Sequence, residues 1–513
     1  MSHETGDNST AKEVRGSTLF LLGRVISTGI GFLTQVLILR YLSKADYGAF
    51  AYALVAISLV QSTIVLGLER VDRQFLSTYD ERRDYGRLAG TIVMELGTIA
   101  SLGLAVTVLL YAFQGSLAGT VVDDRQAVSL LLILILLAPV QAVDDLTMSL
   151  FGVFSRPRAV FFRRWILNPT LRLVVVVVLI LSESSVTFLA TGYVVAGALG
   201  VTLYVGYLVR VLRERGLLAH FRRSSLSLPF REVFGSSVPL MSIDLGVIVM
   251  HTLGVFLLGF YWDTVEVGAL RAVFPLAIIN LLVLRSFSFL YTPIAARLRA
   301  RDEREGIGDL HRQSTVWITV LSFPVFAVTF CLAEPVVVAL FEARYASSAP
   351  YLALLALGYY FQACMGLQAL TLQVFGRVRW ITTANLATAA VNVVLYMLLI
   401  PPYGAMGAAI GTCASLILRN VLLQAGLRLR GEIPPLEWSY WRVYVVVAAS
   451  TVALGLLQLA LAPPLAVGLA LAALASLIVL ASSRSPLRAG ETFPELMRIP
   501  FARRLVGGSA KSR

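Results

Sequence analysis

The sequence predicts an all-α integral membrane protein with about fourteen transmembrane helices. The first observation is composition: of the 513 residues, 57% are hydrophobic and 14% are charged, whereas soluble domains are about half apolar and about a quarter charged. The second is length, because the apolar runs reach the roughly 20 residues that a helix needs to cross a bilayer. The third is uniformity, since strands of a membrane barrel alternate over about ten residues and these runs do not.

Taken in order, the first apolar run follows a polar tail and is longer than the roughly 7–15 residues of a signal-peptide core, so we expect a retained first span. Further apolar runs follow, separated by short polar or basic connections, and Pro139 is expected to kink the fourth. The predicted spans cover residues 17–38, 47–68, 88–113, 128–154, 165–181, 187–209, 233–259, 265–290, 314–333, 349–374, 380–400, 405–427, 441–461 and 464–482.

The basic residues orient these spans. The net charge is +13, from 43 Lys and Arg against 30 Asp and Glu. Outside the spans, the basic residues concentrate in every second connection and in the tails, and cytoplasmic loops are known to collect Lys and Arg. We count Arg163 and Arg164 among these loop residues. Both termini are therefore expected in the cytoplasm, at the plasma membrane of a prokaryote, with membrane lipids and not nucleic acid as the partner of the basic charge. The outer connections hold only Arg40, Lys44, Arg125 and Arg344.

A weak internal repeat divides the chain. Residues 41–50 (YLSKADYGAF) recur 220 residues later at 261–270 (YWDTVEVGAL), with an aromatic start, an acid and Gly-Ala. This indicates two six-helix lobes related by a parallel pseudo-two-fold axis, the arrangement of transporters that rock two lobes. The predicted divisions are a cytoplasmic N-terminal tail (1–16), an N-lobe (17–212), a cytoplasmic linker (213–232), a C-lobe (233–427), two extra helices (428–482) and a cytoplasmic C-terminal tail (483–513).

Several function classes find no support. The three lysines are not in a Gly-Lys-Ser/Thr motif, so no P-loop ATPase is built into this chain. Its three cysteines lack the spacing of a zinc site or a disulfide framework. The outer connections are short, which argues against an enzyme with a large outer domain. We expect no enzyme activity, no catalytic residue, no metal and no cofactor.

Charged side chains inside spans are costly in lipid and usually face a cavity. Arg24 lies in the first span and Arg271 and Arg285 in the eighth, and a guanidinium fork suits a phosphate or pyrophosphate. We expect these three arginines to bind substrate in a cavity between the lobes. Asp244 and His251 share one face of the seventh span and are candidate coupling or gating residues, with Asp244 able to pair with Arg24.

Other polar residues in spans allow more than one interpretation. Arg172 and Glu95 either snorkel to the inner interface or pair there. Asp144 and Asp145 follow the Pro139 kink and either cap the helix or pair with Arg172. Three polar positions of the tenth and eleventh spans fit interhelical hydrogen bonds at least as well as ligand contact: Gln362, Asn385 and Asn392.

Three stretches carry a family resemblance. Residues 39–48 (LRYLSKADYG) with 66–68 (LGL), residues 341–352 (FEARYASSAPYL) and residues 392–409 (NVVLYMLLIPPYGAMGAA) resemble polysaccharide flippases of the superfamily that also holds the multidrug extruders. In the last stretch the two prolines should stop one helix, Gly404 should make the turn, and Gly407 should let the next helix pack closely. The resemblance implies two six-helix lobes, alternating access and arginines on the first and eighth spans.

The resemblance also implies a function. It is the movement of a polyprenyl-(pyro)phosphate-linked oligosaccharide from the inner to the outer leaflet, for cell-surface polysaccharide biosynthesis. The implied partner is that lipid-linked sugar, with glycosyltransferases or a polymerase of the same pathway as further candidates, and we expect a monomer. Two alternatives stay open: a cation-coupled multidrug extruder of the same superfamily, and a membrane polysaccharide polymerase or glycosyltransferase.

Overall fold

A computed structural model describes residues 4–65, 68–115, 124–221, 226–429 and 438–483, and within these ranges the chain forms helices, turns and no strand. The prediction of an all-α protein is confirmed. The chain divides into two compact units, residues 1–268 and 269–513, and each is described by itself. The predicted lobe boundaries stay a prediction.

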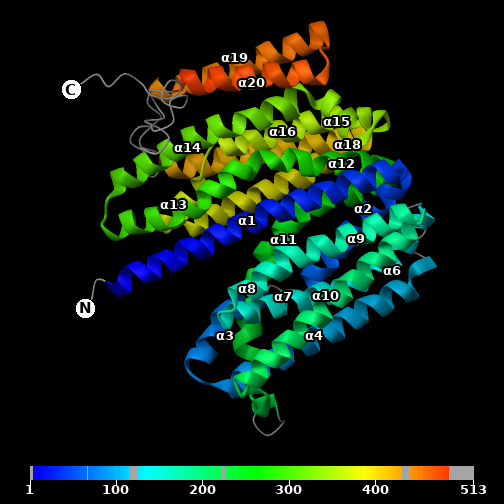
Figure 1. Cartoon of the computed structure of the whole chain (residues 1–513), viewed down its shortest axis with the longest axis vertical. Coiled ribbons are helices and arrows are strands. Elements are labelled where there is room, and N and C mark those ends of the chain that lie inside the picture. Colours follow the sequence, from blue (N-terminus) through cyan, green and yellow to red (C-terminus); the bar gives the residue numbers. More distant parts are fainter. Residues whose placement is uncertain (1–3, 66–67, 116–123, 222–225, 430–437, 484–513) are drawn as a thin grey trace. The chain divides into compact units, whose positions relative to one another are not determined.

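The first unit is a bundle of apolar helices (Figure 1). Within it α2 packs against α6, α7 and α11, and α10 packs against α7 and α9. Its elements are α1 (Glu4–Tyr41), α2 (Lys44–Val65), α3 (Leu68–Glu81), α4 (Tyr85–Ala112), α6 (Arg125–Leu134), α7 (Leu137–Val153), α8 (Pro157–Phe161), the π-helix η1 (Phe162–Leu167), α9 (Asn168–Leu181), α10 (Val186–Glu214), η2 (Leu217–Phe221) and α11 (Phe230–Tyr261). The helix α12 (Thr264–Ile278) begins in this unit.

The predicted kink in the fourth span is confirmed. The helix breaks between Leu134, where α6 ends, and Leu137, where α7 begins. Pro139 explains the position of the break, because it has no N–H to donate to the carbonyl four residues before it. That carbonyl belongs to Ile135, which lies in the break.

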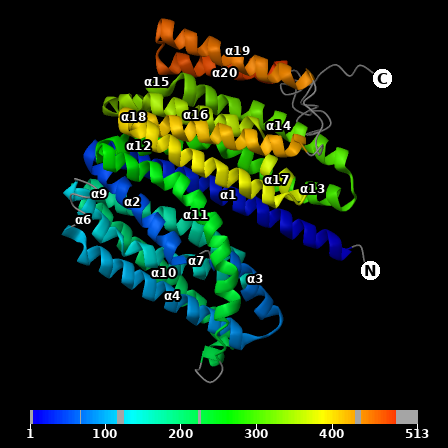
Figure 2. The same cartoon turned by 180° about the vertical axis from the view of Figure 1, so that it is seen from behind.

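The second unit is also a bundle, in which α14, α16 and α18 lie side by side (Figure 2). After α12 its elements are η3 (Ile279–Leu281), α13 (Leu282–Ala300), α14 (Arg304–Phe326), the π-helix η4 (Ala327–Cys331), α15 (Ala333–Phe341), η5 (Ala343–Ser348), α16 (Ala349–Cys364), α17 (Gln368–Val374), α18 (Val378–Leu429), α19 (Trp438–Leu461) and α20 (Leu465–Ser482).

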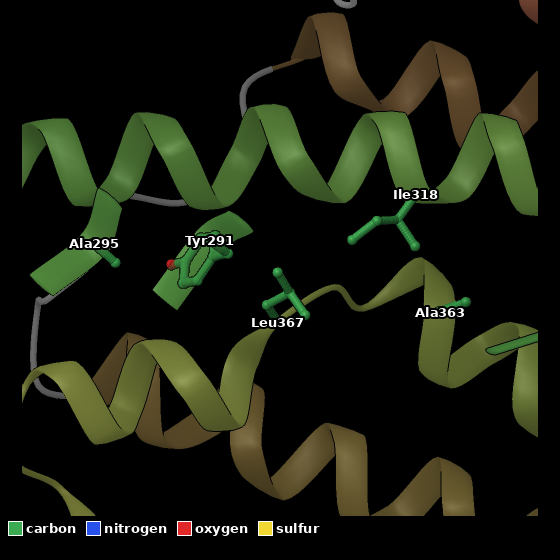
Figure 3. Packing of buried hydrophobic residues seen from close by; sticks show 5 residues of the cluster. All are labelled: Tyr291, Ala295, Ile318, Ala363 and Leu367. Atoms are coloured by element: carbon green, nitrogen blue, oxygen red, sulfur yellow. The ribbon is translucent and has the colours of Figure 1, made fainter. Parts of the chain in front are cut away.

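One buried cluster of the second unit joins α13, α14 and α16. Figure 3 shows Tyr291 between Ala295 and Leu367, with Ile318 and Ala363 beside them. The Tyr291 ring is buried, and its hydroxyl lies 2.6 Å from the Thr371 hydroxyl on α17. A buried tyrosine needs such a partner for its polar end. This hydrogen bond therefore connects α13 to α17.

The corner within α18 has the predicted form. Gly404 takes φ 55° and ψ −133°, a conformation that needs glycine, just after Pro401 and Pro402. A Cβ on Gly407 would overlap the carbonyl oxygen of Leu399, so only glycine lets the two halves approach this closely. The 52-residue α18 is therefore two spans, 380–400 and 405–427, as predicted.

Within the described residues, every predicted span lies mainly on helix. Within the described residues, eleven helical segments are long and apolar enough to cross a membrane, and one of them is the double span of α18. The first and seventh predicted spans fall on α1 and α11. The prediction of a multi-pass bundle is confirmed.

The internal repeat is visible in the helix boundaries. α1 ends at Tyr41 and α11 at Tyr261, while α2 starts at Lys44 and α12 at Thr264, so both pairs keep the spacing of 220 residues. The two glycines of the repeat also meet: a Cβ on Gly268 would lie 3.0 Å from the Cα of Gly48. The corner between the first two spans thus packs on its own repeat.

Candidate functional site

Arg24 is a half-buried charge inside α1. Its carbonyl accepts a hydrogen bond from the Thr28 hydroxyl at 2.8 Å. Its guanidinium makes no ion pair or hydrogen bond with any side chain that the structure describes. A guanidinium at membrane depth is costly unless water or an anion compensates it. Among the side chains that the structure describes, none occupies the donors of Arg24, and Asp244, its expected partner, lies outside that set.

The eighth predicted span is broken, so its two arginines stand on different helices. Arg271 lies on α12 and Arg285 on α13, with η3 between them. The Arg271 guanidinium stacks 5.3 Å from the centroid of the Phe274 ring, and that ring meets Tyr359 of α16 edge-on at 6.1 Å. The second unit thus links Arg271 to Tyr359 through the Phe274 ring, and no pattern in the sequence singles out Tyr359.

Asp244 and His251 both fall on α11, as predicted. Their side chains lie outside the described part of the structure, so their coupling or gating role stays a prediction.

A buried ion pair in the first unit corrects two expectations. Arg163 lies inside the helical segment 158–181 and not in a loop; it is 2% exposed, and its Nε donates to Asp144 Oδ1 at 2.8 Å. Asp144 therefore pairs with Arg163 and not with Arg172, while Asp145 accepts from the Gln61 amide at 2.7 Å. The reason is local: the π-helical turn η1 changes the register of the chain just before Pro169.

A glycine makes room for this pair. A Cβ on Gly200 of α10 would overlap Nη1 of Arg163, so the buried guanidinium lies against bare backbone. Arg163 also stacks 5.6 Å from the ring centroid of Tyr204. The pairing needs η1, α7 and α10 to be packed together, which no spacing in the sequence reveals.

A small polar cavity lies beside the ion pair. Its volume is about 20 Å³, room for a water molecule or a small ion. Arg172 borders it and stacks 5.5 Å from the ring centroid of Tyr193. The sequence predicted only that Arg172 pairs or snorkels at the inner interface, and its place beside this cavity was not predicted. The other lining residues are Leu137, Val140, Gln141, Asp144, Arg163, Asn168, Gly197 and Val201.

Polar residues of α18 join its two halves. The Arg419 guanidinium donates to Asn385 Oδ1 at 2.9 Å, and the Asn392 amide donates to the Ser415 hydroxyl at 2.8 Å. Both asparagines therefore serve interhelical hydrogen bonds, one of the two interpretations that the sequence left open.

Charged contacts tie α3 into the first unit. Asp80 pairs with Arg215 at 3.3 Å, and Arg215 stacks 4.7 Å from the ring centroid of Phe154. Burial, and secondarily the nearby carboxylate of Glu232, raise the pKa of Tyr79 to about 12, so this hydroxyl keeps its proton at physiological pH. The C-terminal part of α3 thus contacts the rest of the first unit through Asp80 and Tyr79.

The comparisons with known proteins agree with this fold. The family model described as polysaccharide biosynthesis protein matches residues 14–298, and the MatE model matches residues 239–398. Among solved structures, the lipid II flippase MurJ in an inward closed conformation superposes with a TM-score of 0.69 at 13% identity, over 94% of this chain and 100% of that one.

Drug transporters share the fold as well. An inward-facing multidrug resistance transporter of the MATE family superposes with a TM-score of 0.65 at 14% identity, over 80% of this chain and 98% of that one. A MATE transporter from Vibrio cholerae gives 0.52 at 14% identity, over 84% and 99%. No curated protein sequence matches the chain significantly.

These findings define the class first: a multi-pass helical membrane protein with the fold of the MOP-superfamily transporters. The family model covers more than half of the chain, and it settles the narrower assignment. The chain belongs to the polysaccharide biosynthesis protein family.

Proposed function

We propose that the chain is a flippase that moves a polyprenyl-(pyro)phosphate-linked oligosaccharide from the inner to the outer leaflet by alternating access. The observation that carries this proposal is Arg24, a guanidinium inside a span with no counter-ion among the described residues. A guanidinium inside a span, without a counter-ion among the described residues, is suited to an anionic lipid-linked substrate. Membership of the polysaccharide biosynthesis family supports a sugar as the cargo.

Arg271 and Arg285 extend the proposal to the second unit. A phosphate offers several acceptor oxygens, and a guanidinium donates two parallel hydrogen bonds to it. Arg271 stacks on Phe274, which packs against Tyr359, and Arg285 lies on the following helix α13, so both arginines belong to the second unit. We assign Arg24, Arg271 and Arg285 to substrate binding, and Asp244 and His251 to coupling or gating.

The cellular setting belongs to the same proposal. We place both termini in the cytoplasm at the plasma membrane of a prokaryote, on the asymmetry of the basic residues. Glycosyltransferases or a polymerase of the pathway would supply or consume the lipid-linked sugar, and the chain would act as a monomer without a cofactor and without enzymatic chemistry.

The first experiment deletes the chain in its host and extracts the polyprenyl-linked sugars from each leaflet. A sugar-lipid that accumulates facing the cytoplasm, with loss of surface polysaccharide, supports the flippase and identifies its substrate. Complementation then compares Arg24→Ala with Arg213→Ala, an exposed arginine near the end of α10. We expect the first variant to abolish export and the second to retain it. Normal export by well-expressed Arg24→Ala would overturn the site assignment.

A cation-coupled drug extruder is the second candidate, because the MatE model matches residues 239–398. It requires an acidic coupling residue, and the sequence offers Asp244 and Glu95. An unchanged lipid pool together with drug sensitivity of the deletion strain would favour this function.

A further inference from the structure

The cavity beside the Arg163–Asp144 pair collects hydrogen-bond donors from three helices of the first unit. Gln141 comes from α7, Asn168 and Arg172 from α9, and Arg163 from η1. Arg163 is 2% exposed, and its Nη1 is buried with no hydrogen-bond partner. The side chains of Gln141, Asn168 and Arg172 make no hydrogen bond or ion pair with any residue in the described ranges. Among these donors Arg163 Nη1 is the buried one, whereas Gln141 and Asn168 are half-buried and Arg172 is exposed. The buried Nη1 beside the cavity is therefore the observation that indicates a ligand.

The charge balance gives the sign of that ligand. The lining holds two guanidiniums and one carboxylate. Asp144 is engaged by Arg163 Nε at 2.8 Å, which leaves the charge of Arg172 without a carboxylate among the described residues. Its one described contact is the face of the Tyr193 ring, 5.5 Å away, and a ring compensates only part of a cation's charge. The cavity therefore favours an anion over a cation.

The size of the cavity selects the kind of anion. A water molecule needs about 10–15 Å³ of such space, and the cavity offers about 20 Å³. A monatomic halide is a little larger than water and fits. A phosphate or a lipid headgroup, with several oxygens around a central atom, is larger than this space and would extend through the open side of the cavity.

We propose that this cavity is a chloride site, in which Arg172, Arg163 and the amides of Gln141 and Asn168 surround the ion. Bound chloride would neutralise the surplus charge of Arg172 and link α7, η1 and α9 through one ligand. The proposal concerns the stability of the first unit and does not depend on what the protein transports.

The first test compares the thermal unfolding midpoint of the purified full-length chain in sodium chloride and in sodium gluconate at equal ionic strength. A ligand that binds only the folded state raises its stability. We expect a higher midpoint in chloride for the unaltered chain and for Arg164→Gln, a control at an exposed arginine outside the cavity lining. The chloride effect should vanish in Arg172→Gln and return in Arg172→Lys, which restores the charge.

Equal midpoints in chloride and gluconate would overturn the proposal, and so would a chloride effect that survives in Arg172→Gln. Sodium phosphate and vesicles of anionic lipid are the comparison arms. If they stabilise the chain and chloride does not, the cavity takes a phosphate group, and the chloride assignment is wrong.

The second test does not depend on how well the variants fold. Crystals of the unaltered chain grown in sodium bromide should show anomalous density beside Arg172, because bromide replaces chloride and scatters anomalously. A cavity without bromide at saturating concentration would refute the site. Loss of bromide binding with export intact, or the reverse, would separate this inference from the proposed function.

Discussion

Replacement of Asp144 by Asn should destabilise the protein strongly. The change keeps the size of the side chain but removes the only described carboxylate paired with Arg163, whose side chain is 2% exposed. Removal of one partner from a buried ion pair costs about 3–5 kcal/mol, because an uncompensated charge stays buried. Gly200 packs directly on Nη1, so the guanidinium has no room to move toward water on that side. We therefore expect the upper part of this range.

The matched control is Asp80→Asn. Asp80 pairs with Arg215 at 3.3 Å, but the two side chains are 22% and 36% exposed, so we expect a loss of about 0–1 kcal/mol. Unfolding of both variants in detergent by a denaturant titration gives the comparison. A double variant, Asp144→Leu with Arg163→Met, should recover most of the loss because no charge remains buried. Asp144 is 18% exposed, close to Asp80, so the contrast rests on the 2% exposure of Arg163. Equal losses in the two single variants would refute the inference that burial of this guanidinium makes its ion pair costlier to break.

Three further predictions follow from the helix contacts and the sequence. Gly404→Ala should lower the unfolding midpoint, because alanine is strained at φ 55° and ψ −133°. Its control, Gly206→Ala, has open space at a mid-helix position and should raise stability by about 1 kcal/mol. The reverse order of stabilities would contradict the backbone conformation described for Gly404. Gly48→Ala should prevent correct folding, because its Cβ would overlap the Thr264 carbonyl; a normal yield of monodisperse protein on gel filtration would exclude that close packing. A fluorescent protein fused to the C-terminus should fluoresce and a periplasmic phosphatase fused there should be inactive; the opposite pair of results would invert the proposed orientation.

Part of the candidate site could be found in the sequence and part could not. Arg24, Arg271 and Arg285 are visible as charges inside apolar runs, because a charge at membrane depth is costly and can be recognised from the sequence alone. Tyr359 was not visible, since a tyrosine in an apolar helix has no distinctive pattern. Its link to Arg271 through Phe274 depends on how α12 and α16 pack within the second unit.

Arg163 shows how a sound rule fails at one residue. Counting basic residues between spans placed it in a loop, because the apolar run begins just after it. In the structure Arg163 instead lies inside the bundle, because the π-helical turn η1 directs it there and Gly200 has no side chain in its way. Asp144 compensates its charge. No count of charges along the chain includes the space that a glycine leaves on another helix.

The sequence by itself determined the class of protein, the number and order of the spans and the corner at Gly404. These follow from the length of apolar runs and from backbone restrictions, which are local and need no knowledge of neighbouring helices. Only the tertiary structure decided the Arg163–Asp144 pair and the small cavity beside it. Pairing between helices depends on register, rotamer and available space, and these are fixed only when the helices pack.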